Sequence, residues 1–130
     1  MGLEEGRAQT GGPSTRSLVA TSEGVHESQV VLARDLGEIF GRLCRWALDE
    51  GSRVALFEPS RPELVDGILA VGARYVDPGR GSDWHLQEEA LDRALEDGDL
   101  RMVVLGRPCP VAGTLPSMSV IRRCLSAGLL

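Results

Sequence analysis

The spacing of apolar residues changes several times along this chain, and each change marks a predicted helix or strand. Between residues 36 and 50 apolar side chains recur every three or four positions, which gives a helix with one apolar face. Asp35 precedes this segment, and Glu38 follows three residues later at the spacing of a capping box. Gly51 is placed to end the helix. The pattern therefore predicts a capped helix over 36–50.

Four further segments show helical spacing. Ser60 and Glu63 form a second capping-box pair, and Ser117 is placed to cap the last helix. Gly24 is placed to stop the first helix. The predicted helices cover residues 14–23, 60–71, 86–95 and the segment that follows Ser117.

Short continuous apolar runs separate these helices and predict buried strands. They cover residues 30–32, 53–57, 74–76 and 100–106. Strands that alternate with helices are typical of a parallel sheet covered by helices. The sequence therefore predicts an α/β fold with a parallel sheet of about four strands and flanking helices.

The last apolar run leads into a loop rich in proline and glycine that continues to Leu115. In parallel α/β sheets, ligands bind in the crevice beyond the carboxyl ends of the strands. The loop after the fourth predicted strand is therefore the first place to look for a binding site.

Composition limits the possible functions. The chain has 130 residues and a net charge of −5, so its length fits one domain, and the absence of a basic stripe argues against nucleic-acid binding. No apolar run approaches the roughly 20 residues of a membrane span. The acidic, polar start is unlike a secretory signal, so we expect a cytoplasmic protein. We expect residues 1–13 to form a flexible tail and 14–130 to form the domain.

The basic residues narrow the chemistry further. All 14 are arginine, so no lysine side chain is present to form a Schiff base. Cys44, Cys109 and Cys124 are odd in number and widely spaced, which fits neither a disulfide framework nor a metal site.

Several residues admit two interpretations. Asp35 and Glu38 resemble an acid–base pair, but a helix cap explains the spacing better. Cys109, between two prolines, is either a reactive thiol or a structural residue, and the structural interpretation is favoured because no histidine or lysine is near in sequence.

The aromatic and histidine side chains are also ambiguous. Trp46 and Trp84 either line a pocket or pack in the core, and packing is favoured for Trp46, which lies beside an apolar stripe. His26 and His85 stand in polar surroundings and are expected at surface or capping positions.

Four segments, in this order, resemble a known family. They read VHESQVVL, DEGSRVALFEPSRPEL, VGARYVD and MVVLGRPCPVAGTL. Together they resemble the large domain of the fold-type-I pyridoxal-phosphate (PLP) aminotransferases, class I/II, nearest the histidinol-phosphate aminotransferase branch. The resemblance implies part of that large domain, with PLP as the family cofactor. In the family, the Schiff-base lysine and the small domain lie further along the chain.

The resemblance also implies three cofactor-binding positions, each of which carries an unexpected residue. Asp35 stands where the family has a glycine in its phosphate-binding turn, Arg61 where an aromatic ring stacks on the pyridine, and Pro110 where an asparagine holds the pyridoxal hydroxyl. Arg107 and Ala112 replace two further motif residues. We therefore expect these positions not to bind PLP, and no catalytic residue is assigned.

Three functions remain open. The first is a degenerate aminotransferase-like domain, non-catalytic and without PLP on this chain alone, that acts as an interaction domain, scaffold or remnant. The second is one piece of a split aminotransferase completed by a partner chain. The third is a domain that binds a small anion through Arg34, Arg61 and Arg107. In each case we expect self-association or a protein partner to cover an exposed sheet edge.

Overall fold

The computed structural model describes residues 12–129 and divides the chain into two units, Met1–Ala33 and Arg34–Leu130. Most of the predicted N-terminal tail lies outside the described residues. Each unit is considered by itself.

The first unit contains one α-helix and one short 3-10 helix. Helix α1 (Thr15–Glu23) begins after Ser14, whose hydroxyl accepts a hydrogen bond from the Ser17 N–H at 3.1 Å. It ends at Gly24, which has a left-handed φ of 66°, so the predicted stop is confirmed. Helix η1 (Glu27–Gln29) is capped by the imidazole of His26, as expected for a histidine at a capping position.

The strand predicted at residues 30–32 is not present. Val30 ends η1, and Val31 and Leu32 belong to no helix or strand and are exposed, with 61% and 43% of their surfaces accessible. Apolar residues alone do not make a strand, because a strand needs a neighbour for its backbone groups. Among the described residues, this segment has no such neighbour.

The second unit contains a parallel sheet of three strands, one fewer than the roughly four expected. The strands are β1 (Arg53–Leu56), β2 (Arg74–Val76) and β3 (Leu100–Val104), in the order β2-β1-β3. Strand β1 pairs in parallel with both neighbours. The predicted α/β class and the parallel sheet are confirmed.

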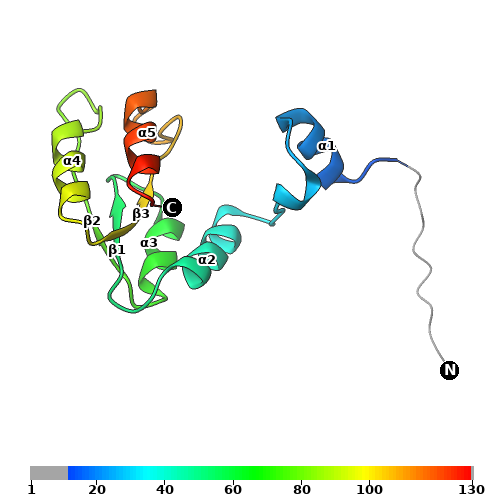
Figure 1. Cartoon of the computed structure of the whole chain (residues 1–130), viewed down its shortest axis with the longest axis horizontal. Helices are drawn as coiled ribbons and strands as arrows, with labels where there is room; N and C mark the ends of the chain where they lie inside the picture. The colour runs from blue at the N-terminus through cyan, green and yellow to red at the C-terminus, as the bar shows by residue number, and fades with distance from the viewer. Residues whose placement is uncertain (1–11, 130) are drawn as a thin grey trace. The chain divides into compact units, whose positions relative to one another are not determined.

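Four helices cover the two faces of this sheet, as Figure 1 shows. They are α2 (Leu36–Ala47), α3 (Pro62–Leu69), α4 (Glu88–Glu96) and α5 (Met118–Ser126). Helices α2 and α3 pack on one face, and α4 and α5 pack on the other.

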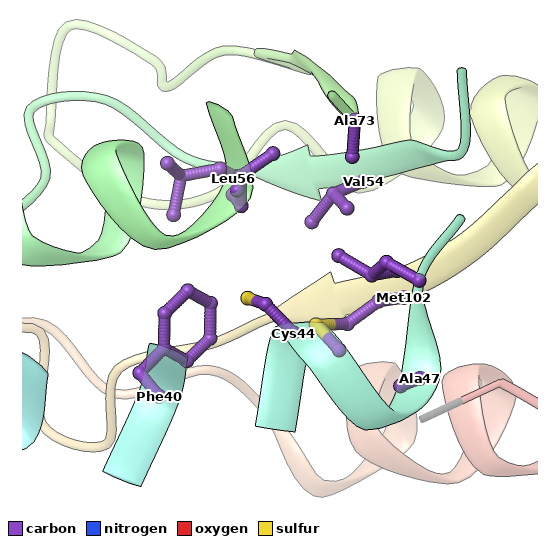
Figure 2. Packing of buried hydrophobic residues seen from close by; sticks show 9 residues of the cluster. Phe40, Cys44, Ala47, Val54, Leu56, Ala73 and Met102 are labelled. Atoms are coloured by element: carbon purple, nitrogen blue, oxygen red, sulfur yellow. The ribbon is translucent and has the colours of Figure 1, made fainter. Parts of the chain in front are cut away.

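Strand β1 and Phe57, the residue that follows it, contribute to the two cores, because successive side chains of an extended segment point to opposite faces. Val54 and Leu56 pack with Phe40 and Cys44 of α2, and Figure 2 shows these side chains meeting between helix and sheet. Phe57 lies in the other cluster, with residues of α4 and α5. Each cluster is made entirely of residues from the second unit.

Helix α2 is shorter than its apolar pattern predicts. It ends at Ala47, and Gly51 lies in the following turn, where its N–H donates to the Gly72 carbonyl at 2.9 Å. Gly51 therefore connects the α2–β1 and α3–β2 turns and does not end the helix.

The predicted packing of Trp46 is wrong. Its side chain is 74% exposed, because the buried stripe of α2 runs through Phe40, Cys44 and Ala47.

The capping box predicted for Ser60 and Glu63 is absent. Arg61 occupies the N-cap of α3 without a side-chain hydrogen bond, and Pro62 is the first helical residue. Proline suits this position because it has no N–H to satisfy. The Ser60 N–H donates instead to a carboxylate oxygen of Glu58 at 2.8 Å.

Two kinds of feature are absent from residues 12–129. No helix in this part of the chain is long and apolar enough to cross a membrane. No three acidic, histidine or cysteine side chains in the same range are grouped as metal ligands would be.

Candidate functional site

A cleft of about 370 Å³ opens beyond the carboxyl ends of β1 and β3. The chain leaves β1 toward β2 on one side and returns to β3 on the other. The carboxyl ends of these two strands are therefore a topological switch point, where open α/β sheets bind their ligands. The loop that the sequence singled out, after β3, forms one wall of the cleft.

Apolar side chains make up most of the lining. They come from both helix layers and from the strand ends. They include Leu36, Phe40, Leu56, Leu64, Leu86, Leu105, Leu115 and Val120.

Arg80 holds three walls of the cleft together. Its Nε donates to the Glu58 carbonyl at 3.1 Å, its Nη1 to the Trp84 carbonyl at 3.1 Å, and its Nη2 to the sulfur of Cys109 at 3.3 Å. The guanidinium also lies 5.8 Å from the centre of the Phe57 ring, within the range of a cation–π contact. One side chain thus links the loops that follow β1, β2 and β3.

Cys109 is a buried part of the cleft wall. Only 5% of its surface is exposed, and its sulfur also accepts from the Ala112 N–H at 3.5 Å. The Cys109 N–H donates to the Thr114 carbonyl at 2.8 Å, which closes the turn. These contacts account for Cys109 as a structural residue of the cleft wall. His85, which is distant in sequence, lines the same cleft.

The start of α2 carries two carboxylates that accept hydrogen bonds from the backbone. Oδ1 of Asp35 accepts from the Glu38 N–H at 2.8 Å, and Oε2 of Glu38 accepts from the Arg34 N–H at 2.9 Å. The expected cap is confirmed, but Glu38 reaches Arg34 and not Asp35. Hydrogen bonds from the backbone and the guanidinium of Arg34 lower the pKa of Glu38.

The aliphatic part of the Glu63 side chain lies beside the same turn. A Cβ added at Gly37 would lie 3.3 Å from Oδ1 of Asp35 and 3.6 Å from Cβ of Glu63. Arg42 pairs with Glu38 at 2.7 Å, so the two neighbouring arginines are already engaged by this carboxylate.

The residues predicted from the sequence are only partly brought together. Arg61 and Pro110 both line the cleft, whereas Asp35 does not. Arg34 and Arg107 are exposed and are not part of the lining. The predicted convergence of three arginines is therefore not formed.

Sequence reasoning missed Arg80, the residue with the most polar contacts in the cleft. Its partners are 4 to 29 positions away in the sequence. The only signal was its place in the loop after a predicted strand, between two glycines.

Comparison with known proteins places this geometry in a known fold. The sequence matches no family model and no curated protein. The structure matches histidinol-phosphate aminotransferase from Sinorhizobium meliloti, solved with pyridoxal-5'-phosphate, with a TM-score of 0.74 and 17% identity. It also matches an alpha-aminoadipate aminotransferase from Thermus thermophilus, solved with N-(5'-phosphopyridoxyl)-L-leucine, with a TM-score of 0.74 and 22% identity.

The chain has part of the aminotransferase fold. Each match covers 88% of this chain and 31% of the solved one, so the aminotransferase-like chain spans about a third of the length of these structures. The resemblance read from the sequence is thus confirmed at the level of the fold.

Proposed function

We propose that this aminotransferase-like chain does not hold PLP by itself and is a non-catalytic binding or interaction domain. The observation that carries the proposal is the start of α2, where the carboxylate of Asp35 caps the helix. The sequence resemblance puts the phosphate-binding turn of the family at this position.

A phosphate binds a helix N-terminus through free backbone N–H groups and through the positive end of the helix dipole. Here the Glu38 N–H is already used by Asp35, and the Arg34 N–H is used by Glu38. The carboxylate of Asp35, which makes no ion pair with residues 12–129, therefore stands where an anion would bind, whereas Glu38 is paired with Arg34 and Arg42. Electrostatic repulsion and the loss of donors both disfavour a phosphate.

The other positions implied by the resemblance support the same proposal. Arg61 offers no ring to stack on a pyridine, and Pro110 has no side-chain donor. Because the chain has no lysine, it has no side chain to attach PLP covalently.

Equilibrium dialysis against PLP, followed by absorbance, tests this proposal. We expect no stoichiometric PLP band to remain after dialysis. The α-amino group is the only primary amine in a lysine-free chain, so an N-terminally acetylated sample serves as the matched control. One equivalent of PLP retained by both samples would overturn the proposal.

We also propose that a second chain covers an edge of the sheet. Within the described residues, β2 and β3 each have β1 as their only paired neighbour, so each leaves one row of backbone groups open to pairing. Sedimentation velocity is expected to show a dimer or larger species. A monomer across the concentration range would contradict this part of the proposal.

A split aminotransferase completed by a partner chain is the second candidate. In that case a partner chain supplies the lysine. Co-purification with such a partner and recovered transaminase activity would support it, and it predicts PLP binding only in the complex.

A further inference from the structure

The cleft lining contains more basic side chains than acidic ones. Arg61, Arg80 and His85 lie in the lining, whereas Glu88 is its only carboxylate. A charge in the lining is available to a ligand only where no side chain of opposite charge already balances it. The partners of the three fully charged side chains therefore decide what the cleft can bind.

Two of these three charges are balanced by neighbouring side chains. Oε2 of Glu88 accepts from Nη2 of Arg123 at 2.8 Å, and Arg123 also pairs with Asp92 at 2.9 Å. Arg61 lies 3.6 Å from Glu63, with half of its side chain exposed. A cationic ligand would have to compete with Arg123 for the carboxylate of Glu88.

The third charge, on Arg80, has no such partner. Arg80 is partly buried and makes no ion pair with any residue in 12–129. Its three hydrogen bonds go to the carbonyls of Glu58 and Trp84 and to the sulfur of Cys109. A guanidinium has five N–H groups, so Nη1 and Nη2 each keep one N–H for a further acceptor. Because a charge withdrawn from water is costly unless it is paired, an anion in the cleft would stabilise Arg80.

We propose that the cleft binds a small organic carboxylate with an apolar body, and that its carboxylate pairs with Arg80. The two remaining N–H groups match in number the two oxygens of a carboxylate. The apolar lining suits an aromatic or aliphatic body, and the volume of about 370 Å³ lies in the range of ligand pockets. One unpaired positive charge balances one negative charge, which favours a carboxylate over a dianionic phosphate.

This anion site is separate from the start of α2, where Asp35 disfavours a phosphate. Asp35 does not line the cleft, and Arg80 lies in the loop between β2 and α4. The inference rests on the proposed function, because it requires a cleft that PLP does not fill.

Three probes with the same naphthalene ring test the sign of the charge that the cleft prefers. They are naphthoate, naphthol and naphthylmethylammonium. In an NMR titration of the full chain, naphthoate should shift the signals of cleft residues such as Leu105 and Val120. It should bind at least about tenfold more tightly than naphthol, and the ammonium should bind most weakly. Naphthoate that binds no more tightly than naphthol, or that shifts no cleft signals, would overturn the inference.

Two arginine substitutions test the role of Arg80. Arg80→Gln removes the unpaired charge and should reduce naphthoate binding to the strength of naphthol binding. Arg122 is exposed and does not line the cleft, so Arg122→Gln changes the net charge equally and should keep the preference for naphthoate. A preference that survives Arg80→Gln, or that both variants lose equally, would contradict the assignment.

A second pair of variants localises the binding without removing the bonds that Arg80 makes to three loops. Leu115 lines the cleft and is 57% exposed, whereas Val111 is 54% exposed and does not line it. Leu115→Trp should fill the mouth and weaken naphthoate binding by at least about tenfold, and Val111→Trp should leave it unchanged. Equal binding by both tryptophan variants would place naphthoate outside the cleft and overturn the inference.

The outcomes separate the two proposals. If naphthoate fails these tests and no PLP is retained after dialysis, this inference fails alone. If one equivalent of PLP is retained and naphthoate competes with it, the proposed function fails, and the inference fails with it.

Discussion

Asp35 fixes the start of α2 with a hydrogen bond from the Glu38 N–H at 2.8 Å. Glu38 adds a second bond, from the Arg34 N–H, one residue further out than a capping box would place it. The two carboxylates thus secure the backbone on both sides of the helix start. The carboxylate of Asp35 therefore has two effects: it stabilises the start of α2, and its negative charge disfavours a bound anion.

Two substitutions of Asp35 separate the hydrogen bond with the Glu38 N–H from the charge of the carboxylate. Asp35→Ala removes the acceptor and should cost about 1 kcal/mol in the free energy of unfolding, measured with urea. Asp35→Ser keeps an acceptor without the charge and should stay within a few tenths of a kcal/mol of the parent chain. Equal losses in both variants would show that the cap is not the stabilising contact.

Glu88 gives the chain a predictable response to acid. The hydrogen bond from Arg123 lowers the pKa of Glu88 below its ordinary value of 4.5. A carboxyl whose pKa is lower in the folded state stabilises the fold above the unfolded pKa and loses that contribution as the pH falls through the folded pKa. We therefore expect Glu88→Gln to lower the melting temperature at neutral pH, by a few degrees at most, since the pair is partly exposed.

The difference between Glu88→Gln and the parent chain should vanish in acid, where the carboxyl is protonated in both states. Glu89→Gln is the control, because Glu89 makes no ion pair with any residue in 12–129. A constant difference across the pH range would contradict the assignment.

At the scale of elements, helices α2 and α3 approach closely at a glycine. A Cβ at Gly67 would lie 2.9 Å from Cδ1 of Phe40, a contact that requires the ring to move. At Gly41, also in a helix, the nearest atom is the flexible Nη1 of Arg45 at 3.5 Å. The two glycines therefore differ in their surroundings while sharing the same backbone conformation.

This contrast predicts opposite effects of alanine. Gly41→Ala should stabilise the chain by up to about 1 kcal/mol through helix propensity. Gly67→Ala should destabilise it by about 1–3 kcal/mol, because the overpacked core outweighs that gain. Thermal unfolding followed by circular dichroism measures both, and a stabilising Gly67→Ala would show that Phe40 moves at no cost.

The elements themselves were largely predictable from local patterns. Helices α1 and α5 begin where Ser14 and Ser117 cap them, and β1, β2 and β3 lie where the apolar runs predicted. One failure involves a missing partner for a strand, and the other involves a local contact that competes with the predicted cap. The run at 30–32 has no pairing neighbour among the described residues, and α3 begins at Pro62 while Ser60 bonds to Glu58.

The site was less predictable than the fold, because its contacts join residues far apart in the sequence. The loop after β3 was identified because strand ends carry ligand sites in any parallel sheet. The role of Arg80 depends on contacts with Glu58 and Cys109, 22 and 29 residues away. Local patterns hold no record of such contacts, so only the folded chain shows them.

At the scale of the whole molecule, the chain divides between Ala33 and Arg34, and the two hydrophobic clusters belong entirely to the second unit. Burial of apolar surface is the main force that stabilises a fold. We therefore expect the stability of the sheet and its four helices to reside in residues 34–130.

A truncated chain that begins at Arg34 tests this expectation. It should unfold cooperatively with a melting temperature within a few degrees of the full chain, and it should lose the helical signal of α1. Val19→Pro in the full chain, which breaks α1, should leave that temperature equally unchanged. Ile68→Ala, at a fully buried position of the larger cluster, should cost about 2–5 kcal/mol. If the truncation proved as damaging as Ile68→Ala, the first unit would have to contribute to the stability of the second, and the two units would fold as one.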